Sequence, residues 1–397
     1  MKNKLNQLNT KLNALTVFRQ LLSDPVIANF QYLADTLNTK DTQEQVDAYC
    51  EFTSALYQES SNLSTYIHKL IRNDENFYVK SKAAGKEVSP VIEISLGAEL
   101  ETLEELAGVT SASIKDSIDF KGFLPDWENS YLNLYEDYKE RIEMLPVTGY
   151  GVYAKFSTFH LEDGKIVPVH HPDSQSLDTM FGYERERNMI IKNTEALISG
   201  EGASNMLLYG DAGTGKSSTI KAVCNHFASK GLRLLEIKKN ELYRIPYVVE
   251  ELSANPLKFV IFIDDLSFTA NDDNFSALKA ILEGSVTTCG NNIAIYATSN
   301  RRHLVKETMG ERNGDELHIN DTLQETMSLA ARFGLTITYQ RPEKDQYLDI
   351  VKNLAAAYGI EMDEAELFKK AEAHAIRRSG RSPRVAKQFI ELLKVGL

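Results

Sequence analysis

The sequence predicts an α/β protein in which a parallel β-sheet is preceded by a mainly helical region and followed by a second helical region. Three observations predict this fold. Apolar runs of strand length alternate with helical segments between about residues 200 and 340. A glycine-rich loop follows the first of these runs and leads into a helix. Apolar residues at helical spacing dominate residues 1–145 and 341–397.

Residues 1–145 are predicted to form a helical N-terminal domain. Three or four helices are expected up to residue 66, and Asp24-Pro25 marks the start of one of them. Residues 72–90 are polar and predict a loop, whereas residues 92–106 and 131–144 predict further helices. Trp127, beside Pro125, is expected in the core. This region shows no catalytic pattern, so its expected role is packing or partner binding.

A β-hairpin and a linker are expected over residues 146–176. Residues 150–159 alternate between apolar and polar, the chain turns at Asp163-Gly164, and an apolar run resumes at 166–169. The polar stretch 171–176 then predicts a linker to a core that covers residues 177–340.

The core contains a complete phosphate-binding loop between a buried-strand run and a helix start. Its glycines allow backbone N–H groups to turn inward around phosphates, and the helix N-terminus adds its positive dipole end. Lys216 is expected to reach the β- and γ-phosphates, and Ser217 to hold Mg²⁺. The residues expected to bind nucleotide here are Gly210, Asp211, Ala212, Gly213, Thr214, Gly215, Lys216, Ser217 and Ser218.

A second apolar strand, residues 259–263, ends in two carboxylates. Asp264 is the expected Mg²⁺ partner through water, and Asp265 the expected general base for the attacking water. The 48 positions from Lys216 to Asp264 leave room for a helix, a strand at 232–237 and a second helical connection. That arrangement suits a parallel sheet wound by right-handed crossovers.

A third strand, residues 293–298, ends in Ser299-Asn300. An amide at the carboxyl end of a strand can reach a γ-phosphate or its attacking water. An Asn in isolation is more often a turn residue, but the position of Asn300 after the acidic strand favours a phosphate sensor.

The order of these motifs resembles the AAA+ ATPases, with a phosphate loop, an acidic strand, a strand ending in Ala-Thr-Ser-Asn, and then Ala330-Ala331-Arg332-Phe333-Gly334. The resemblance implies a P-loop NTPase sheet that ends in a fifth strand at 335–339, and a helical lid over 341–397. It implies that Arg332 is an arginine finger for a neighbouring subunit, and that Arg384, with Arg381 as second choice, touches the γ-phosphate from the same chain. The segment implied to close over adenine contains Phe181, Gly182 and Tyr183.

Four further stretches are similar to a bacterial AAA+ family labelled domain of unknown function 815. They are Gly-Tyr-Glu at 182–184, Leu-Leu-Tyr-Gly-Asp at 207–211, Asp-Asp-Leu-Ser-Phe at 264–268 and Tyr-Ala-Thr-Ser-Asn-Arg-Arg-His-Leu at 296–304. The likeness runs from about residue 150 to the C-terminus. AAA+ proteins usually have Glu where this chain has Asp265, and the shorter side chain leaves the hydrolysis rate open.

Composition limits the other function classes. The formal net charge of −12 opposes broad attachment to nucleic acid or to an anionic membrane, so nucleic acid is possible as a partner but not indicated. A basic group on the lid is explained more simply by a sensor Arg and its solvated neighbours; it comprises Arg377, Arg378, Arg381, Arg384 and Lys387. No signal-peptide core or membrane-length apolar run is evident, which predicts a cytoplasmic protein without membrane contact. Cys50, Cys224 and Cys289 indicate neither a disulfide framework nor a metal site, and buried thiols are expected.

The sequence therefore predicts an ATPase that binds ATP and Mg²⁺, assembles into a homo-oligomer and acts on an unidentified protein client. Two alternatives remain: a slow-hydrolysing, nucleotide-gated switch, and a DNA-loader-like ATPase, which ranks lower because no helix-turn-helix follows the lid. A small-molecule kinase is least favoured, since it has no need for a neighbour's arginine. Residues 303–324 are expected to be either a partner-binding insertion or a mobile loop. The preference for ATP over GTP rests on the AAA+ resemblance.

Overall fold

The structure, a computed structural model, describes residues 2–267, 278–279, 281–282, 291–300, 331–378 and 380–396. The chain divides into two compact units, Met1–Gly151 and Val152–Leu397. Cys289 and residues 303–324 lie outside the described residues.

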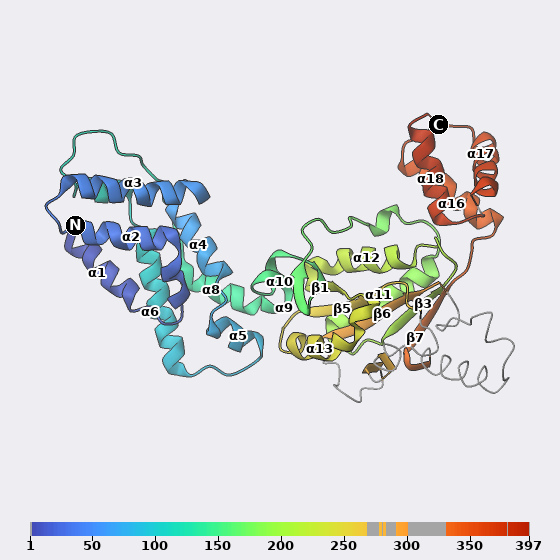
Figure 1. The fold of residues 1–397 in the computed structure, drawn as a ribbon, viewed down its shortest axis with the longest axis horizontal. Coiled ribbons are helices and arrows are strands. Elements are labelled where there is room, and N and C mark those ends of the chain that lie inside the picture. Colours follow the sequence, from blue (N-terminus) through green and yellow to red (C-terminus); the bar gives the residue numbers. More distant parts are fainter. Residues whose placement is uncertain are drawn as a thin grey trace. The chain divides into compact units, whose positions relative to one another are not determined.

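The first unit is helical, as the sequence predicts (Figure 1). Asp24 shows how one helix begins: its carboxylate accepts hydrogen bonds from the N–H groups of Val26 and Ile27, and Pro25 occupies the first helical position. The helices are α1 (Lys2–Asn13), η1 (Arg19–Ser23), α2 (Pro25–Thr36), α3 (Thr42–Glu59), α4 (Leu63–Asn73), α5 (Phe77–Ala83), α6 (Pro90–Ala107), α7 (Ser111–Lys115), α8 (Leu134–Glu143) and α9 (Leu145–Thr148). The prediction of a loop through 72–90 was wrong at α5, where Asn76 caps the helix through the N–H of Val79.

A buried carboxylate joins two distant parts of this unit. Glu99, on α6, is 7% exposed and accepts hydrogen bonds from the backbone N–H groups of residues 16–18 and from the hydroxyl of Thr16. These donors belong to the turn between α1 and η1. Because a buried carboxylate is stable only with such partners, Glu99 fixes the turn against α6.

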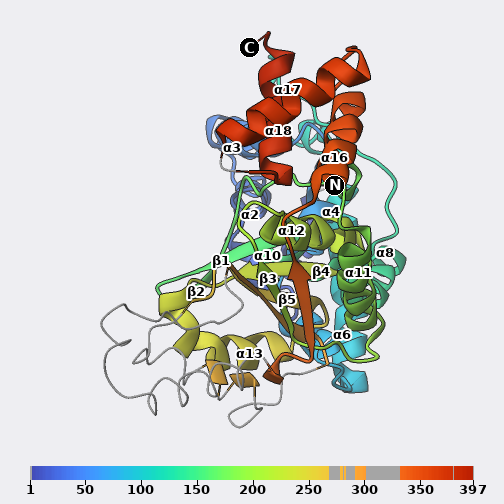
Figure 2. The same cartoon turned by 90° about the vertical axis from the view of Figure 1, so that its right-hand side faces the viewer.

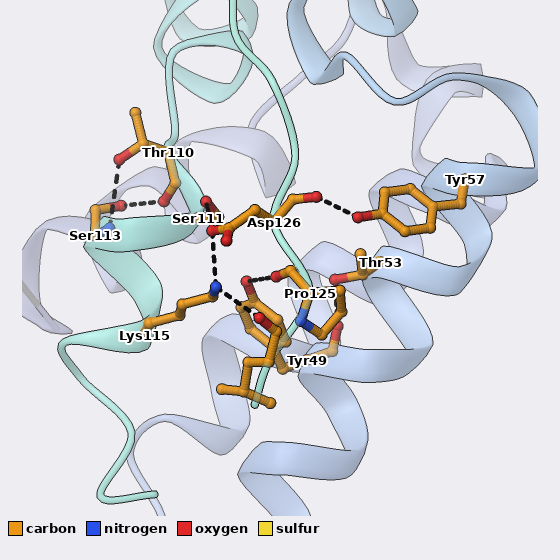
Figure 3. Close-up of polar contacts among 10 residues, drawn as sticks. Tyr49, Thr53, Tyr57, Thr110, Ser111, Ser113, Lys115, Pro125 and Asp126 are labelled. Carbon is orange, nitrogen blue, oxygen red and sulfur yellow. Dashed lines mark hydrogen bonds and ion pairs between the residues drawn. The ribbon is translucent and has the colours of Figure 1, made fainter. Parts of the chain in front are cut away.

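Polar contacts also anchor the extended segment that follows α7, and Figure 3 shows them. Lys115 lies 2.7 Å from the Asp126 carboxylate and donates a second hydrogen bond of 2.7 Å to the carbonyl of Leu124. From α3, the hydroxyl of Tyr49 donates to the carbonyl of Pro125, and that of Tyr57 to the carbonyl of Asp126. These contacts hold Trp127 in the core at 6% exposure, as predicted.

In the residues that the structure describes, the second unit is built on a seven-stranded sheet of order β2-β1-β4-β5-β6-β3-β7. Every pairing is parallel except that of β1 with β2. The strands are β1 (Thr158–Glu162), β2 (Lys165–Pro168), β3 (Met206–Gly210), β4 (Leu232–Glu236), β5 (Lys258–Ile263), β6 (Ile293–Ser299) and β7 (Leu335–Tyr339). The predicted fifth core strand is confirmed as β7, which pairs with β3.

Helices cover both faces of this sheet. Helices α11 (Glu184–Ser199) and α12 (Lys216–Phe227) lie on one face, and α13 (Ile245–Ser253) lies on the other (Figure 2). Three lid helices, α16 (Lys344–Ala357), α17 (Glu364–Arg377) and α18 (Pro383–Lys394), share a separate apolar core. The described part of this unit also contains the short helical turns α10 (Val152–Lys155), η2 (Leu177–Thr179), η3 (Ala228–Lys230) and η4 (Lys239–Arg244). The predicted class, an α/β P-loop sheet with a helical lid after a helical N-terminal region, is confirmed.

Two features of the predicted hairpin differ from the structure. The strand predicted over 150–159 starts only at Thr158, because residues 152–155 form the helical turn α10. The ring of Tyr153, in that turn, packs on the rings of Phe159 and Phe259 with centroids 5.0 and 5.6 Å away. The alternation of apolar residues that predicts a strand therefore reflects core packing of a helical turn. The hairpin also joins the core sheet, since β1 pairs in parallel with β4.

The described cysteines differ in exposure. Cys224 is buried, and its burial raises the pKa of the thiol. The expectation of a buried thiol was wrong for Cys50, which lies on the solvent side of α3. None of the helices in the described part of the chain could span a bilayer, since each is too short or too polar.

Candidate nucleotide-binding site

The carboxyl ends of β3, β5 and β6 meet at one edge of the sheet, beside the lid. They border a cleft of about 590 Å³. Most of the predicted site residues line this cleft: Phe181, Gly182, Tyr183, Ala212, Gly213, Thr214, Gly215, Lys216, Ser217, Ser218, Asp264, Asp265, Asn300 and Arg384. Gly210, Asp211 and Arg332 do not line it.

The phosphate loop begins at position 210, where only glycine fits. Gly210 has φ of +134°, and a Cβ atom there would lie 2.0 Å from the carbonyl oxygen of Tyr339 on β7. That oxygen accepts the N–H of Asp211 at 3.0 Å. The close approach of β7 therefore fixes where the loop leaves β3.

Lys216 lies folded across the inside of the loop. Its ammonium donates to the carbonyls of Gly210 and Asp211 at 2.9 and 2.8 Å, and to the Oδ1 of Asn300 at 3.0 Å. The side chain is buried, and desolvation lowers its pKa, while the carboxylates of Asp211, Asp265 and Asp264 oppose that shift. Because hydrogen bonds between charged groups are stronger than those to neutral carbonyls, this ammonium would gain by exchanging its carbonyl partners for phosphate oxygens.

The metal ligands that the sequence predicts lie together. The hydroxyl of Ser217 donates to Oδ1 of Asp264 at 2.6 Å, and the hydroxyl of Thr298 donates to the same oxygen at 2.5 Å. A hydroxyl and a carboxylate at the mouth of a phosphate loop are the hard oxygen ligands that suit Mg²⁺. The residues present therefore fit that ion.

The candidate base and sensor form a second pair. The side-chain amide of Asn300 donates to Oδ1 of Asp265 at 2.8 Å, while its own oxygen accepts from Lys216. Asp265 itself has φ of +50°, which is uncommon for a residue with a side chain. A continuous chain of hydrogen bonds thus links the phosphate loop to the acidic strand end.

The lid contacts the phosphate loop through the start of α18. The backbone N–H of Arg384 donates to the carbonyl of Gly213 at 3.2 Å, and its exposed side chain lines the cleft. Arg381, the second choice, is engaged elsewhere, because its guanidinium bonds both carboxylate oxygens of Glu372 at 2.8 and 2.7 Å. Of the two arginines, Arg384 lines the cleft and Arg381 does not.

The segment expected to close over the base lies between core and lid. Tyr183 lines the cleft but is only 8% exposed, because its ring stacks on Tyr339 with centroids 5.0 Å apart. Its hydroxyl donates to the carbonyl of Gln340 at 2.5 Å, and burial raises its pKa. Phe181 packs partly against the lid core, and a Cβ at Gly182 would meet Ile350 at 2.8 Å.

Arg332 lies before the amino end of β7, at the opposite end of the strands from the cleft. It precedes β7, whose carboxyl end, Tyr339, pairs with Gly210. A five-residue strand spans about 17 Å, so Arg332 is far from the phosphate loop of its own chain.

Sequence reasoning missed one residue at this site, Thr298, and one contact of a predicted residue, Asp211. Thr298 bonds to both acidic residues, and its signal was a hydroxyl within a strand that is otherwise almost entirely apolar. Asp211 accepts the backbone N–H of Arg341 at 3.0 Å and lies 3.7 Å from its guanidinium, which ties the phosphate loop to the start of the lid. No local pattern points to that second contact, because 130 positions separate its partners.

The strand order, the phosphate loop and the lid define an α/β P-loop protein with a helical lid. The family model described as "Protein of unknown function (DUF815)" matches residues 153–396, and the chain belongs to this family. No curated protein gives a significant match.

Several solved structures resemble part of the chain. The Thermotoga maritima RuvB Holliday junction branch migration motor is 16% identical, with a TM-score of 0.32 over 56% of this chain and 74% of that one. AMPPCP-bound DnaA from Aquifex aeolicus is 15% identical, with a TM-score of 0.41 over 57% and 67%. The FIGL-1 AAA domain in complex with ADP is 18% identical, with a TM-score of 0.36 over 57% and 74%.

Proposed function

We propose that this chain is a Mg²⁺-dependent ATPase that works as a homo-oligomer and uses its nucleotide state to act on a protein partner. One observation carries the proposal: Lys216, Asn300 and Asp265 are joined by hydrogen bonds of 3.0 and 2.8 Å at the mouth of the phosphate loop. The start of α12 and the segments that follow β5 and β6 thereby bring a cation, a carboxylate and an amide to one cleft. In phosphoryl transfer a cation stabilises the phosphate charge, and polar side chains position the attacking water.

Each group has a distinct role in this proposal. The loop amides and Lys216 bind the phosphate charge, and Ser217 and Asp264 hold Mg²⁺. When bound, Mg²⁺ neutralises charge on the β- and γ-phosphate oxygens. Asp265 polarises the attacking water as general base, and Asn300 orients that carboxylate.

Two arginines complete the proposed site from different sides. Arg384 contacts the γ-phosphate from the lid of the same chain, supported by its position on the cleft. Arg332 lies at the far edge of its own sheet, which supports a role in the site of a neighbouring subunit. Turnover then depends on assembly, because an arginine finger contributes about 10³- to 10⁵-fold in rate.

The first test compares binding and turnover in three variants. Lys216→Ala is expected to weaken ATP binding about 10- to 100-fold, as loss of charged hydrogen bonds does. Asp265→Asn is expected to keep binding and to lower turnover about 10²- to 10⁴-fold. Lys369→Ala, on the exposed side of α17, is the matched control. Undiminished binding by Lys216→Ala would refute the assigned site.

The proposed action of Arg332 in the site of a neighbouring subunit has a sharper test. Arg332→Ala is expected to bind ATP normally and to lose most of its turnover. Mixing it with Lys216→Ala subunits, which bind ATP poorly but still carry Arg332, is expected to restore part of the activity. If the mixture stays as inactive as its components under conditions where the subunits assemble, Arg332 does not act in the site of a neighbouring subunit.

A second candidate function is a nucleotide-gated switch that hydrolyses ATP slowly. The observation that favours it is the short side chain of Asp265, whose Oδ1 already accepts the amide of Asn300. Under this alternative Asp265→Ala leaves the low turnover almost unchanged, while Lys216→Ala abolishes partner binding. The same turnover assay separates the two candidates.

The N-terminal unit is the proposed partner-binding part. It has its own core, and several of its large apolar side chains are exposed, among them Phe123 at 88% and Tyr131 at 92%. A monomeric unit gains nothing from such exposure, whereas protein interfaces are enriched in aromatic side chains. The proposed organisation is thus a helical binding domain before an ATPase core and lid.

A further inference from the structure

Thr298 occupies an unusual place for a hydroxyl. It lies on β6, next to the end of β5, and is 1% exposed in a strand whose residues are all buried. A buried hydroxyl is costly unless it has hydrogen-bond partners. Its partners therefore show what the side chain does in the folded chain.

Those partners are three consecutive residues beyond the end of β5. The hydroxyl donates to Oδ1 of Asp264 at 2.5 Å and accepts the backbone N–H of Asp265 at 3.0 Å. The carbonyl of Thr298 accepts the N–H of Leu266 at 2.7 Å. Thr298 thus fixes the carboxylate of Asp264 and the backbone of both Asp265 and Leu266.

This clamp holds a backbone conformation that the site needs. If the extended conformation of β5 continued, Asp264 and Asp265 would point to opposite faces, but both line the same cleft. The left-handed φ of +50° at Asp265 allows this. Such a conformation costs about 1–3 kcal/mol and persists where its surroundings hold it in place.

We propose that Thr298 is a positioning residue that sets the geometry of the metal-binding acid and the general base together. This inference rests on the proposed function, since it concerns how Asp264 meets Mg²⁺ and how Asp265 meets the water. Thr298 acts through the carboxylate of Asp264 and the backbone of Asp265 and Leu266. Its loss should therefore impair steps that depend on Mg²⁺ more than nucleotide binding itself.

The test uses the full chain with Thr298→Val, which keeps the shape and removes the hydroxyl, and Thr298→Ser, which restores a hydroxyl. Thr194→Val is the matched control, because Thr194 is also buried and hydrogen-bonded but lies on α11, outside the residues that line the cleft. Binding of a fluorescent ATP analogue is measured with EDTA and over a Mg²⁺ titration. Steady-state turnover gives kcat and KM separately.

Thr298→Val is expected to bind the analogue in EDTA within about twofold of wild type. The Mg²⁺ concentration for half-maximal effect should rise about 10- to 100-fold, the usual cost of losing a group that orients a metal ligand. The value of kcat should fall about tenfold or more while KM changes little, and Thr298→Ser should recover most of both losses. Thr194→Val should change neither the Mg²⁺ response nor kcat, even if it loses as much thermal stability as Thr298→Val.

Three results would have different meanings. If Thr298→Val responds to Mg²⁺ and turns over like Thr194→Val, the positioning role is wrong while the proposed function stands. A wild-type chain whose nucleotide binding does not respond to Mg²⁺ would overturn the proposed function and, with it, this inference. A wild type that binds Mg²⁺-nucleotide without turnover leaves the Mg²⁺ titration as the deciding measurement for Thr298.

Discussion

Replacing Gly210 with Ala tests the packing that places the phosphate loop. The new Cβ would lie 2.0 Å from the carbonyl oxygen of Tyr339, well inside van der Waals contact. The clash is with backbone, so no side-chain rotation relieves it. Either β7 moves away from β3 or the loop leaves its position, and both break the hydrogen bond from the N–H of Asp211 to that carbonyl.

The cost has three parts. The φ of +134° is unfavourable for alanine by about 1 kcal/mol or more. The lost hydrogen bond contributes about 1 kcal/mol, and forcing two packed strands apart costs about 1–3 kcal/mol. Gly210→Ala should therefore lower the free energy of unfolding of the second unit by about 3–5 kcal/mol, and weaken ATP binding because Gly210 also holds Lys216.

Gly202→Ala is the matched control. Gly202 also has a positive φ, +90°, but a Cβ there meets nothing within 4 Å. Its cost is the backbone strain alone, about 1 kcal/mol. The difference between the two variants isolates the clash with β7.

Urea unfolding followed by far-UV circular dichroism measures both variants. With a slope of about 2 kcal/mol per molar urea, Gly210→Ala should lower the midpoint by about 2 M and Gly202→Ala by about 0.5 M. Trp127, the chain's single tryptophan, reports the first unit, and its fluorescence transition should not move. Equal shifts for the two variants would refute the clash argument.

Two further predictions concern buried ionisable groups. Glu99→Gln places an amide against the backbone donors of residues 16–18. The free energy of unfolding of the first unit, measured by Trp127 fluorescence in urea, should therefore fall by about 2–3 kcal/mol. An unchanged midpoint would refute the anchoring role. His374, whose buried Nε2 has no hydrogen-bond partner among the residues that the structure describes, has a pKa lowered by desolvation and then by the charge of Arg378. The unfolded chain therefore takes up the proton first, and stability conferred by this group is lost as pH falls below about 6.5. Thermal unfolding of wild type between pH 7 and 5 should show that loss, and His374→Gln should reduce it; identical pH dependence of the two proteins would contradict the assignment.

The elements of the P-loop core could be predicted from sequence because their signals are local. A buried strand followed by a glycine-rich loop and a helix depends on residues within one short stretch, and β3 and α12 form where that pattern predicts them. The same local logic failed at residues 150–155. Alternation there comes from Tyr153 packing as a helical turn, and a short amphipathic pattern does not distinguish that from a strand.

The arrangement of the site shows a similar division. Sequence order alone identified Asp264, Asp265 and Asn300 as strand ends, and parallel strands bring such ends to one edge. It did not identify Thr298, because a threonine in a strand is ordinary and only its neighbours reveal that its hydroxyl serves two acids. Nor did it show that the ring of Tyr183 is buried against Tyr339, a pairing between residues 156 positions apart.

The sequence by itself determined the phosphate loop, the apolar strands and the helical lid, since backbone conformation and amphipathic period are properties of neighbouring residues. Tertiary structure alone decided that the hairpin joins the sheet through β1 and β4, that Asp211 holds Arg341 at the start of the lid, and that Arg332 lies at the edge opposite the loop. These are contacts between distant positions, and each forms only because many other parts of the chain have already been brought together by burial of the core. No short stretch of sequence contains that information.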